Sequence, residues 1–323
     1  MGAVIEPTSK KGQANLEVFS QTLQDLAKTD REVIVVTSDS RGSGKLVPFG
    51  EKFPKQIVEI GIAEQNLVGV AAGLASTGKK VFAVSPACFL TARALEQIKN
   101  DVAYSDNPVR LIGISAGVSY GALGSTHHSL HDFAVLRAIN NLTVVAPADN
   151  WETQSAIELA AKTDAPIYLR FGKKNMPDLP NLGQPFEFGK GRIVREGTDL
   201  AIIATGEAVL PAFEAAENLA EKYGIQTRVI SMHTIKPLDY DLVEKTAKEC
   251  SAMITVEEHS VYGGLGEACA SFLLQKGYSK PFKIVGIPDE YTVTGSQLEI
   301  FEHYGISQKG LTETALNLNQ KSV

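Results

Sequence analysis

Short apolar runs rich in β-branched residues alternate with longer segments of helical periodicity along the first half of the chain. The apolar runs predict strands, and they lie at residues 33–38, 79–86, 108–115, 142–148 and 166–171. The helical segments lie at residues 13–28, 64–77, 91–104, 130–138 and 151–162. Because parallel strands are usually connected through a helix, this alternation predicts a parallel sheet with helices on both faces.

The pattern breaks at residues 172–186, "GKKNMPDLPNLGQPF", where three prolines and the absence of periodicity predict a linker. A second series follows, with strands expected at 199–206, 227–232, 252–258 and 283–288 and helices expected at 208–223, from Tyr240 and after Gly266. The expected fold class is therefore α/β. We expect two α/β domains, one at residues 1–190 and the other at 191–323, both of ordinary domain size.

The composition is that of an ordinary globular protein, since 44% of the 323 residues are hydrophobic and 21% are charged. A net charge of −6 with dispersed Lys and Arg offers no basic surface for nucleic acid. Cys88, Cys250 and Cys269 lack CxxC spacing and are typical of reduced core thiols. The first residues lack the apolar core of a signal peptide, and no apolar run reaches the roughly 18 residues of a membrane span. These features predict a soluble, cytoplasmic protein.

One carboxylate interrupts an apolar stretch of the sequence. Glu64, in "EIGIAEQN" (59–66), stands where a buried strand is expected to run into a buried helix. A carboxylate taken out of water costs several kcal/mol unless another group compensates it. The pattern therefore predicts a specific partner for Glu64.

The segment "SRGSGKLVP" (40–48) follows an expected strand. It is not a phosphate loop of the Walker type, because Asp39 and Leu46 occupy two of the positions that define that motif. We expect a turn at the carboxyl end of the sheet, where ligands bind in open α/β folds. Arg41, Ser43 and Lys45 either hold an anion there or belong to an ordinary solvated loop.

The segment "SYGALGSTHHSLHD" (119–132) places three histidines between a strand and a helix. Zinc is disfavoured because adjacent His127 and His128 cannot easily face one ion and no Cys or HExxH partner is present, so no metal site is expected. Proton transfer or hydrogen bonding to a substrate suits imidazole better, and one histidine is expected only to cap the next helix. The segment "HSVYGGLGEA" (259–268) lacks GxGxxG spacing and predicts tight strand-to-helix packing, with His259 at the edge of a site.

Several ordered motifs resemble one family. They are "EIGIAEQNLVGVAAGLA", "ACFLTARALEQIKNDVAYS", "GALGSTHHSLHDFAVLRAI", "EEHSVYGGLGEA" and "GSQLEIFEHYGI". Together they resemble the thiamine-diphosphate enzymes of the transketolase superfamily, and most of all the C-terminal subunit of split transketolases. The resemblance covers the whole chain and implies a pyrimidine-binding domain followed by a transketolase C-terminal domain. It implies transfer of a two-carbon ketol unit from a ketose to an aldose.

The resemblance also implies roles for single residues. Glu64 corresponds to the glutamate that hydrogen-bonds the aminopyrimidine of the cofactor and promotes loss of the thiazolium proton. Phe89 corresponds to the aromatic residue that packs against the pyrimidine, and Arg93 to an arginine of the cofactor site. His127 corresponds to a histidine that touches the donor sugar and relays protons, with His128 beside it in the substrate site.

Arg170 in "YLRF" corresponds to an arginine that grips the substrate phosphate, a task that suits a guanidinium. Two positions depart from the pattern of full-length transketolases. Leu123 replaces an acidic residue that contacts the donor sugar, and Ser115 replaces a substrate-binding histidine. Arg41 and Ser43 are expected to supply the missing polar contacts, which would suit an unusual ketose phosphate.

The family holds Mg²⁺ and the cofactor diphosphate through a "GDG" segment on a separate domain, and no "GDG" occurs in this sequence. The resemblance therefore implies that an N-terminal transketolase subunit holds the Mg²⁺ and that the enzyme is an α2β2 assembly acting on sugar phosphates. Residues 67–74 are expected at the subunit contacts. Three alternatives stay open: the β subunit of a 2-oxoacid dehydrogenase E1 component, a subunit of a split 1-deoxyxylulose-5-phosphate synthase, and a non-catalytic paralogue.

Overall fold

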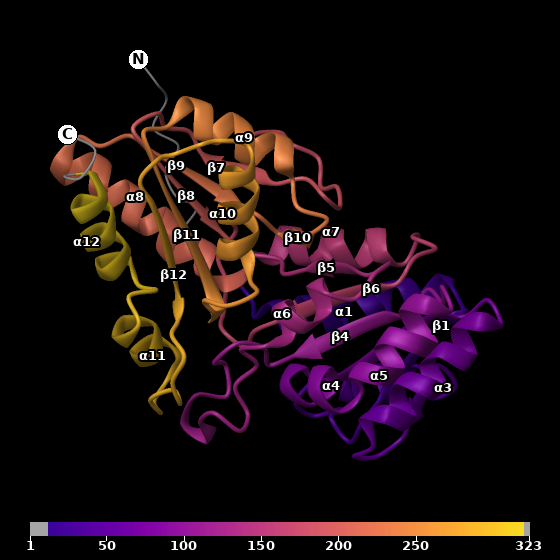
Figure 1. The fold of residues 1–323 in the computed structure, drawn as a ribbon. Coiled ribbons are helices and arrows are strands. Elements are labelled where there is room, and N and C mark those ends of the chain that lie inside the picture. The colour runs from indigo at the N-terminus through magenta and orange to yellow at the C-terminus, as the bar shows by residue number, and fades with distance from the viewer. Residues whose placement is uncertain (1–11, 320–323) are drawn as a thin grey trace.

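The structure is a computed structural model that describes residues 12–319, so the expectation about a signal peptide, which concerns residues 1–11, lies outside it. The chain forms two sheets, each covered by helices on both faces (Figure 1). The expected α/β class with two α/β units is confirmed. Among the described helices, none combines the length and apolar content needed to cross a membrane.

The first sheet has seven strands in the order β10-β5-β6-β4-β3-β1-β2. Their bounds are β1 Val33–Thr37, β2 Ile57–Glu59, β3 Lys80–Pro86, β4 Arg110–Ile114, β5 Thr143–Val145, β6 Ile167–Phe171 and β10 Thr234–Lys236. All neighbours are parallel except β10, which runs antiparallel to β5. The expected parallel sheet is thus extended by a strand from the second half of the chain.

Helices cover both faces of this sheet. Their bounds are α1 Asn15–Thr29, α2 Val47–Lys52, α3 Glu64–Ser76, α4 Ala87–Arg93, α5 Leu95–Gln97, the π-helix η1 Ile98–Tyr104, the 3₁₀ turn η2 Gly121–Leu123, α6 Asp132–Arg137 and α7 Asn150–Ala160. Alternate side chains of β3 enter opposite cores, because successive residues of a strand point to opposite faces. Val81 packs with the α3 side and Phe82 with the α1 and α7 side.

Two expectations about this half are corrected. The single helix expected at 91–104 is divided, because Ala94 leaves helical geometry (φ −105°, ψ 19°) between α4 and α5, and a π-helix follows. The strand before Glu64 is not buried, since β2 lies at the edge of the sheet and Ile62 is 74% exposed. The apolar pattern alone does not distinguish an edge strand from a central one.

The second sheet has five strands in the order β12-β11-β8-β9-β7, all parallel except β7, which runs antiparallel to β9. The strands are β7 Arg192–Arg195, β8 Leu200–Ala204, β9 Thr227–Ser231, β11 Ala252–Ser260 and β12 Phe282–Ile287. The helices are η3 Gly206–Ala208, α8 Val209–Tyr223, α9 Tyr240–Glu249, α10 Leu265–Gln275, α11 Gln297–His303 and α12 Gln308–Asn319. One core lies under α8 and α12 and the other under α9 and α10.

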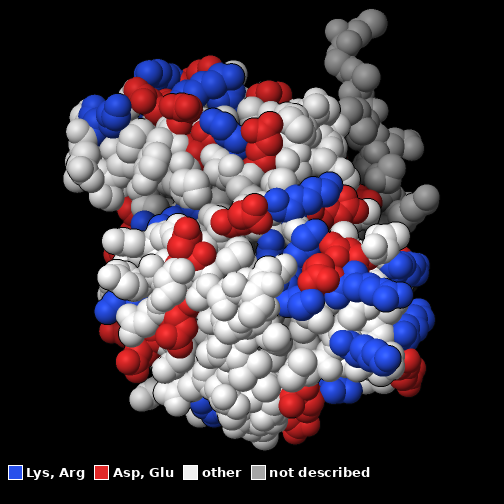
Figure 2. Space-filling model, turned by 90° about the vertical axis from the view of Figure 1, so that its right-hand side faces the viewer, with Lys and Arg blue, Asp and Glu red and all other residues white. Residues whose placement is uncertain are grey.

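Charged side chains are unevenly distributed over the surface. In the view of Figure 2, they gather over the upper part of the molecule, and a broad area below has few charges. Exposed apolar side chains of the first half of the chain include Val58, Ile62 and Tyr104. Cys88, Cys250 and Cys269 are free and buried, as expected from their spacing.

Candidate active site

Glu64 is the first residue of α3, and its partner is Arg93, the last residue of α4. Nη1 of Arg93 donates to both carboxylate oxygens of Glu64, at 3.0 Å each. The Glu64 side chain is 3% exposed, whereas that of Arg93 is 49% exposed. The charge expected to need a partner is therefore compensated by a guanidinium that itself reaches the surface, and by its place at a helix N-terminus.

Aromatic rings continue outward from Arg93. Its guanidinium carbon lies 4.4 Å from the centre of the Phe89 ring. The His127 ring meets Phe89 edge-on at 5.3 Å and Tyr120 edge-on at 5.4 Å. We call Phe89, Arg93, Tyr120 and His127 the ring cluster. It joins three residues predicted from the sequence, and it connects them to Glu64.

The topology of the sheet explains this meeting. The segment of Phe89 and Arg93 begins directly after β3, and the loop that carries Tyr120 and His127 follows β4. These strands are parallel neighbours in the first sheet. Because the carboxyl ends of parallel strands lie at one edge, both segments reach the edge where open α/β sheets bind ligands.

Ser115 marks the start of the second segment. It is fully buried and has a positive φ of 53°, which is uncommon for a residue other than glycine. Burial raises the pKa of the Tyr120 phenol, and a hydrogen bond with Ser115 opposes that rise. Ser115 thus lies beneath Tyr120, whereas Leu123, the other departure from the family pattern, is exposed.

Arg41 and Ser43 lie elsewhere on the first sheet. Arg41 Nε donates to Glu59 at 3.2 Å, and Ser43 Oγ donates to the Ser40 carbonyl at 3.2 Å. Glu59 belongs to the edge strand β2. Within residues 12–319, no hydrogen bond, ion pair or ring contact joins Arg41 or Ser43 to the ring cluster.

His128 points away from its neighbour His127. Its Nδ1 lies 2.6 Å from Thr292 Oγ1, and its Nε2 lies 3.0 Å from the Gly121 carbonyl oxygen. The carbonyl can only accept, so Nε2–H donates to it and Nδ1 accepts from the threonine hydroxyl. Burial lowers the pKa of His128. The structure therefore assigns both its ring nitrogens to holding the 121–128 loop against the second half of the chain.

Arg170 departs from the phosphate contact expected for it. The side chain is 6% exposed, and its Nη1 donates to both carboxylate oxygens of Asp132, at 2.9 and 3.2 Å. Its Nη2 donates to the backbone carbonyl of Glu258 at 2.9 Å, and Phe133 lies 4.3 Å from its guanidinium carbon. A guanidinium occupied in this way joins the two halves of the chain and presents no free donor edge to a substrate.

Two buried carboxylates face each other behind Arg170. Gln297 Nε2 donates to Glu207 Oε2 and to Glu258 Oε1, at 2.8 Å each. Burial, and then the charge of Glu258, raise the pKa of Glu207 to about 8. Because Glu207 comes from the second half and packs against Gly172 of the first, this pair also lies between the halves.

The segment at 259–268 has the expected tight packing. An added Cβ at Gly264 would lie 2.0 Å from the Glu257 carboxylate, which accepts from the backbone N–H groups of Leu265 and Gly266 at the start of α10. His259 is not at the edge of a site. It is fully buried and stacks on Phe133 with ring centres 4.9 Å apart, and burial lowers its pKa to about 4.

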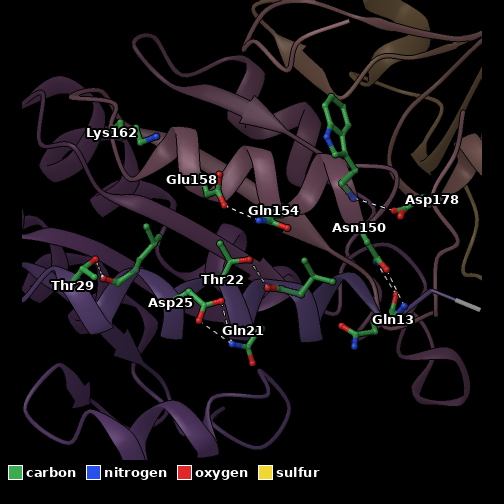
Figure 3. Close-up of a pocket in the computed structure, with 13 residues that line it drawn as sticks. Gln13, Gln21, Thr22, Asp25, Thr29, Asn150, Gln154, Glu158, Lys162 and Asp178 are labelled. Carbon is green, nitrogen blue, oxygen red and sulfur yellow. Dashed lines mark hydrogen bonds between the residues drawn. The ribbon is translucent and has the colours of Figure 1, made fainter. Parts of the chain in front are cut away.

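A separate groove of about 550 Å³ lies between α1 and α7. Gln13 and Asn150 exchange two hydrogen bonds of 2.9 Å at one end, and Gln154 donates to Glu158 (Figure 3). None of the residues predicted for the site lines it. No group of three or more His, Cys, Asp and Glu side chains suited to a metal ion occurs among residues 12–319.

Sequence reasoning missed Tyr120 and Lys173. Tyr120 stands in the histidine segment, and the only signal for it is an aromatic residue within that loop. Lys173 follows β6 directly, and its Nζ lies 3.9 Å from the centre of the Tyr120 ring. Its position in the expected linker conceals it, although it follows a central strand at the carboxyl edge of the sheet.

The fold and the ring cluster define a two-unit α/β protein with its site at the carboxyl edge of the first sheet. The family model for the transketolase pyrimidine-binding domain matches residues 11–178, and that for the transketolase C-terminal domain matches residues 189–311. The chain belongs to the transketolase family.

Relatives of known activity are similar over nearly the whole chain. One of the two kinds of chain in the apulose-4-phosphate transketolase of Phocaeicola vulgatus is 48% identical, covering 94% of this chain and 96% of that protein. A 6-deoxy-6-sulfo-D-fructose transketolase subunit of a Clostridium species is 31% identical, covering 94% of each. Among solved structures, an inactive β4 tetramer of a split-gene transketolase has a TM-score of 0.83 at 35% identity, covering 96% of this chain and 98% of that one.

Proposed function

We propose that this chain is the pyrimidine-binding subunit of a split transketolase, which transfers a two-carbon ketol unit between sugar phosphates. The observation that supports this most is the buried Glu64 carboxylate, which is joined through Arg93 to a phenylalanine and a histidine at the ligand edge of a parallel sheet. Membership of the transketolase family implies thiamine diphosphate as the cofactor. When bound, this cofactor supplies the carbon nucleophile that carries the two-carbon unit.

The residues present suit the cofactor. A nitrogen of an aminopyrimidine needs an acidic partner shielded from water, and Glu64 is such a group. Its side-chain partner in the described chain is Arg93, which has room to move because half of its side chain is exposed. Phe89 offers an aromatic face beside them. In this proposal Glu64 holds a proton at the pyrimidine ring, Phe89 orients that ring, and Arg93 helps to bind the cofactor.

His127 is proposed to hold and move protons at the substrate oxygens. Imidazole is the usual side chain for that role near neutral pH. Its ring is fixed by edge contacts with Phe89 and Tyr120 rather than by a hydrogen bond to a deeper group. A hydrogen bond joins its Nδ1 to the exposed hydroxyl of Thr126 at 3.0 Å. The other ring nitrogen, Nε2, is therefore proposed to meet the substrate.

We further propose that a companion subunit holds the cofactor diphosphate and Mg²⁺, in an α2β2 assembly with domains at 1–190 and 191–323. The relative from Phocaeicola vulgatus is named as one subunit of its enzyme, and the β4 tetramer of a split-gene transketolase is described as inactive. The buried thiols suit a reducing compartment, and we propose the cytoplasm.

The expected subunit contact at 67–74 needs revision. Leu67, Val68 and Ala71 are fully buried within their own chain, so they are not available to a partner. The open face of α3 instead presents Gly69 and Gly73, and an added Cβ at either would meet nothing within 4 Å. Ile62 is exposed just before the helix. We propose that this face, rather than the apolar stripe, lies at a subunit contact.

Reconstitution tests the proposal. Ketol transfer and 2-oxoacid decarboxylation are measured with the companion subunit, thiamine diphosphate and Mg²⁺, and only ketol transfer is expected. Decarboxylation of a 2-oxoacid would support the E1 alternative, condensation of pyruvate with glyceraldehyde 3-phosphate the synthase alternative, and no activity the non-catalytic one. The isolated chain is expected to bind the cofactor weakly, and micromolar Mg²⁺-dependent binding in titration calorimetry would contradict partner dependence.

A further inference from the structure

We propose that Lys173, held against the ring of Tyr120, binds the terminal oxyanion of the sugar substrate, a phosphate monoester or a sulfonate. This inference rests on the proposed function, since it concerns the substrate of the same site. It assigns to a lysine at the carboxyl edge of the sheet the charge recognition expected of Arg170, whose guanidinium is buried and occupied.

Lys173 has no anionic partner in the described part of the chain. Its contact is with the face of Tyr120, 3.9 Å from the ring centre. Other lysines of the same half are paired, for example Lys79 with Glu32 at 2.5 Å and Lys80 with Asp30 at 2.7 Å. A cation resting on an aromatic face keeps its N–H groups free for a ligand, because the ring accepts no more than a weak interaction.

The fold fixes the position of this lysine. Gly172, the residue after β6, packs so closely on Glu207 that an added Cβ would lie 2.1 Å from its carboxylate. The chain that leaves β6 is therefore tied to the second half of the protein, and Lys173 is directed toward Tyr120. Since β6 neighbours β4, Lys173 comes to the same edge of the sheet as His127.

One aromatic ring contacts both the lysine and the histidine. The edge of His127 meets Tyr120 at 5.4 Å, and the Lys173 ammonium lies over the Tyr120 ring. A sugar phosphate carries its reacting carbonyl or hydroxyl at one end and its charge at the other. An anion held by Lys173 would therefore leave the uncharged end of the same molecule beside His127.

The local electrostatics favour an anion here. The pKa of Lys173 is lowered, first by burial of its ammonium and then by the charge of Lys45. Lys45 belongs to the 40–48 segment, and its carboxylate partner, Glu17, lies 3.4 Å away and is itself about half exposed. Two neighbouring lysines gain from one bound oxyanion, because an opposite charge favours the protonated form of each.

The test compares Lys173→Gln with Lys173→Arg and with the matched control Lys174→Gln in the reconstituted complex. Lys174 is the adjacent residue, carries the same charge, and lies near Glu207 and Glu214 instead of Tyr120. The measured quantity is the ratio of kcat/KM for D-xylulose 5-phosphate to that for D-xylulose. We expect Lys173→Gln to lower the ratio at least tenfold, the size of a lost hydrogen bond to a charged group, and Lys173→Arg to restore most of it.

A second measurement does not depend on turnover. In the same complex, the rate of acylation of each lysine is followed by peptide mass spectrometry. Inorganic phosphate and D-xylulose 5-phosphate are expected to slow labelling of Lys173 but not of Lys174, relative to chloride at equal ionic strength and to D-xylulose. If the complex turns over neither sugar, the proposed function fails, and the labelling still decides whether Lys173 binds an oxyanion.

Two outcomes would overturn the inference. One is an equal loss of selectivity in Lys173→Gln and Lys174→Gln, which would indicate a diffuse effect of charge. The other is the same labelling rate of Lys173 with phosphate and with chloride.

Discussion

Arg93 binds Glu64 through a single nitrogen, Nη1, which donates to both carboxylate oxygens at 3.0 Å. The acid is buried and the base is half exposed, so the acid is fixed in place while the base is free to turn outward. This geometry suits a carboxylate that must exchange one partner for another. In the absence of a ligand Arg93 compensates the charge, and a bound aminopyrimidine would compensate it in the complex.

Replacing Arg93 with Met is therefore expected to destabilise the isolated chain, because a buried carboxylate loses its partner. We expect a loss of about 1–3 kcal/mol, the cost of an unsatisfied buried polar group. In the reconstituted complex, added thiamine diphosphate should raise the thermal midpoint of Arg93→Met more than that of the wild type. An equal increase in both would contradict the exchange of partners.

Replacing Glu64 with Gln is expected to slow hydrogen–deuterium exchange at C2 of the thiazolium ring at least 100-fold in the reconstituted complex. An amide keeps the size of the side chain but cannot share a proton with the pyrimidine nitrogen. Exchange is measured by NMR after acid quenching, with Glu96→Gln on the neighbouring helix as the control. Exchange near the wild-type rate would remove Glu64 from its proposed role.

The adjacent histidines should respond differently to replacement by Ala. His127→Ala is expected to lower turnover about 100-fold with little change in stability, since this ring faces the proposed substrate site. His128→Ala is expected to lower stability by about 1–3 kcal/mol, because it leaves the buried groups of Thr292 and Gly121 unpaired. Thr292→Val should reproduce part of the latter effect. Kinetics and chemical denaturation separate the two results, and a severe kinetic defect in His128→Ala alone would reverse the assignment.

The buried Glu207 predicts a dependence of stability on pH. Its pKa in the folded chain, about 8, lies above its ordinary value of 4.5, so the folded state binds the proton more tightly than the unfolded state. Stability should therefore fall as pH rises from 4.5 to about 8, and this contribution should level off above that range. The groups that face the carboxylate are Glu258, Gln297, Arg170 and Lys174.

Glu207→Gln imitates the protonated acid and can still accept from Gln297. We expect its thermal midpoint to match that of the wild type near pH 5 and to exceed it by a few degrees near pH 9. The exposed Glu221→Gln serves as the control and should show no such difference. A wild-type curve that rises between pH 5 and pH 8 in parallel with that of the variant would contradict the prediction.

Local patterns allow the alternating strands and helices to be predicted, because apolar periodicity reports burial within each element. They also make Glu64 stand out, since a charge in an apolar run is visible in a single segment. His127 and Phe89 are identified through resemblance to a family. Their meeting follows from the parallel order of β3 and β4, which the alternation indicates.

Long-range partners cannot be predicted in this way. Asp132 and Glu258, which occupy Arg170, lie 38 residues before it and 88 residues after it, and no local pattern connects them. Lys173 is ordinary in sequence and becomes distinctive only because the fold places it over Tyr120 without a carboxylate partner among the described residues. Short edge strands such as β2 and β10, with three residues each, lack the length at which periodicity is readable.

The antiparallel strand β10 has a practical consequence for anyone who cuts or rebuilds this chain. It returns from the second half to cover the β5 edge of the first sheet, so a fragment that stops in the 172–191 segment would expose β5 as an unpaired edge. Such edges recruit other strands and promote aggregation. A protease nick in that segment should leave the two pieces associated, and separate expression of the pieces should yield insoluble material. Fusion partners and affinity tags are accordingly better placed at the ends of the chain than at the linker.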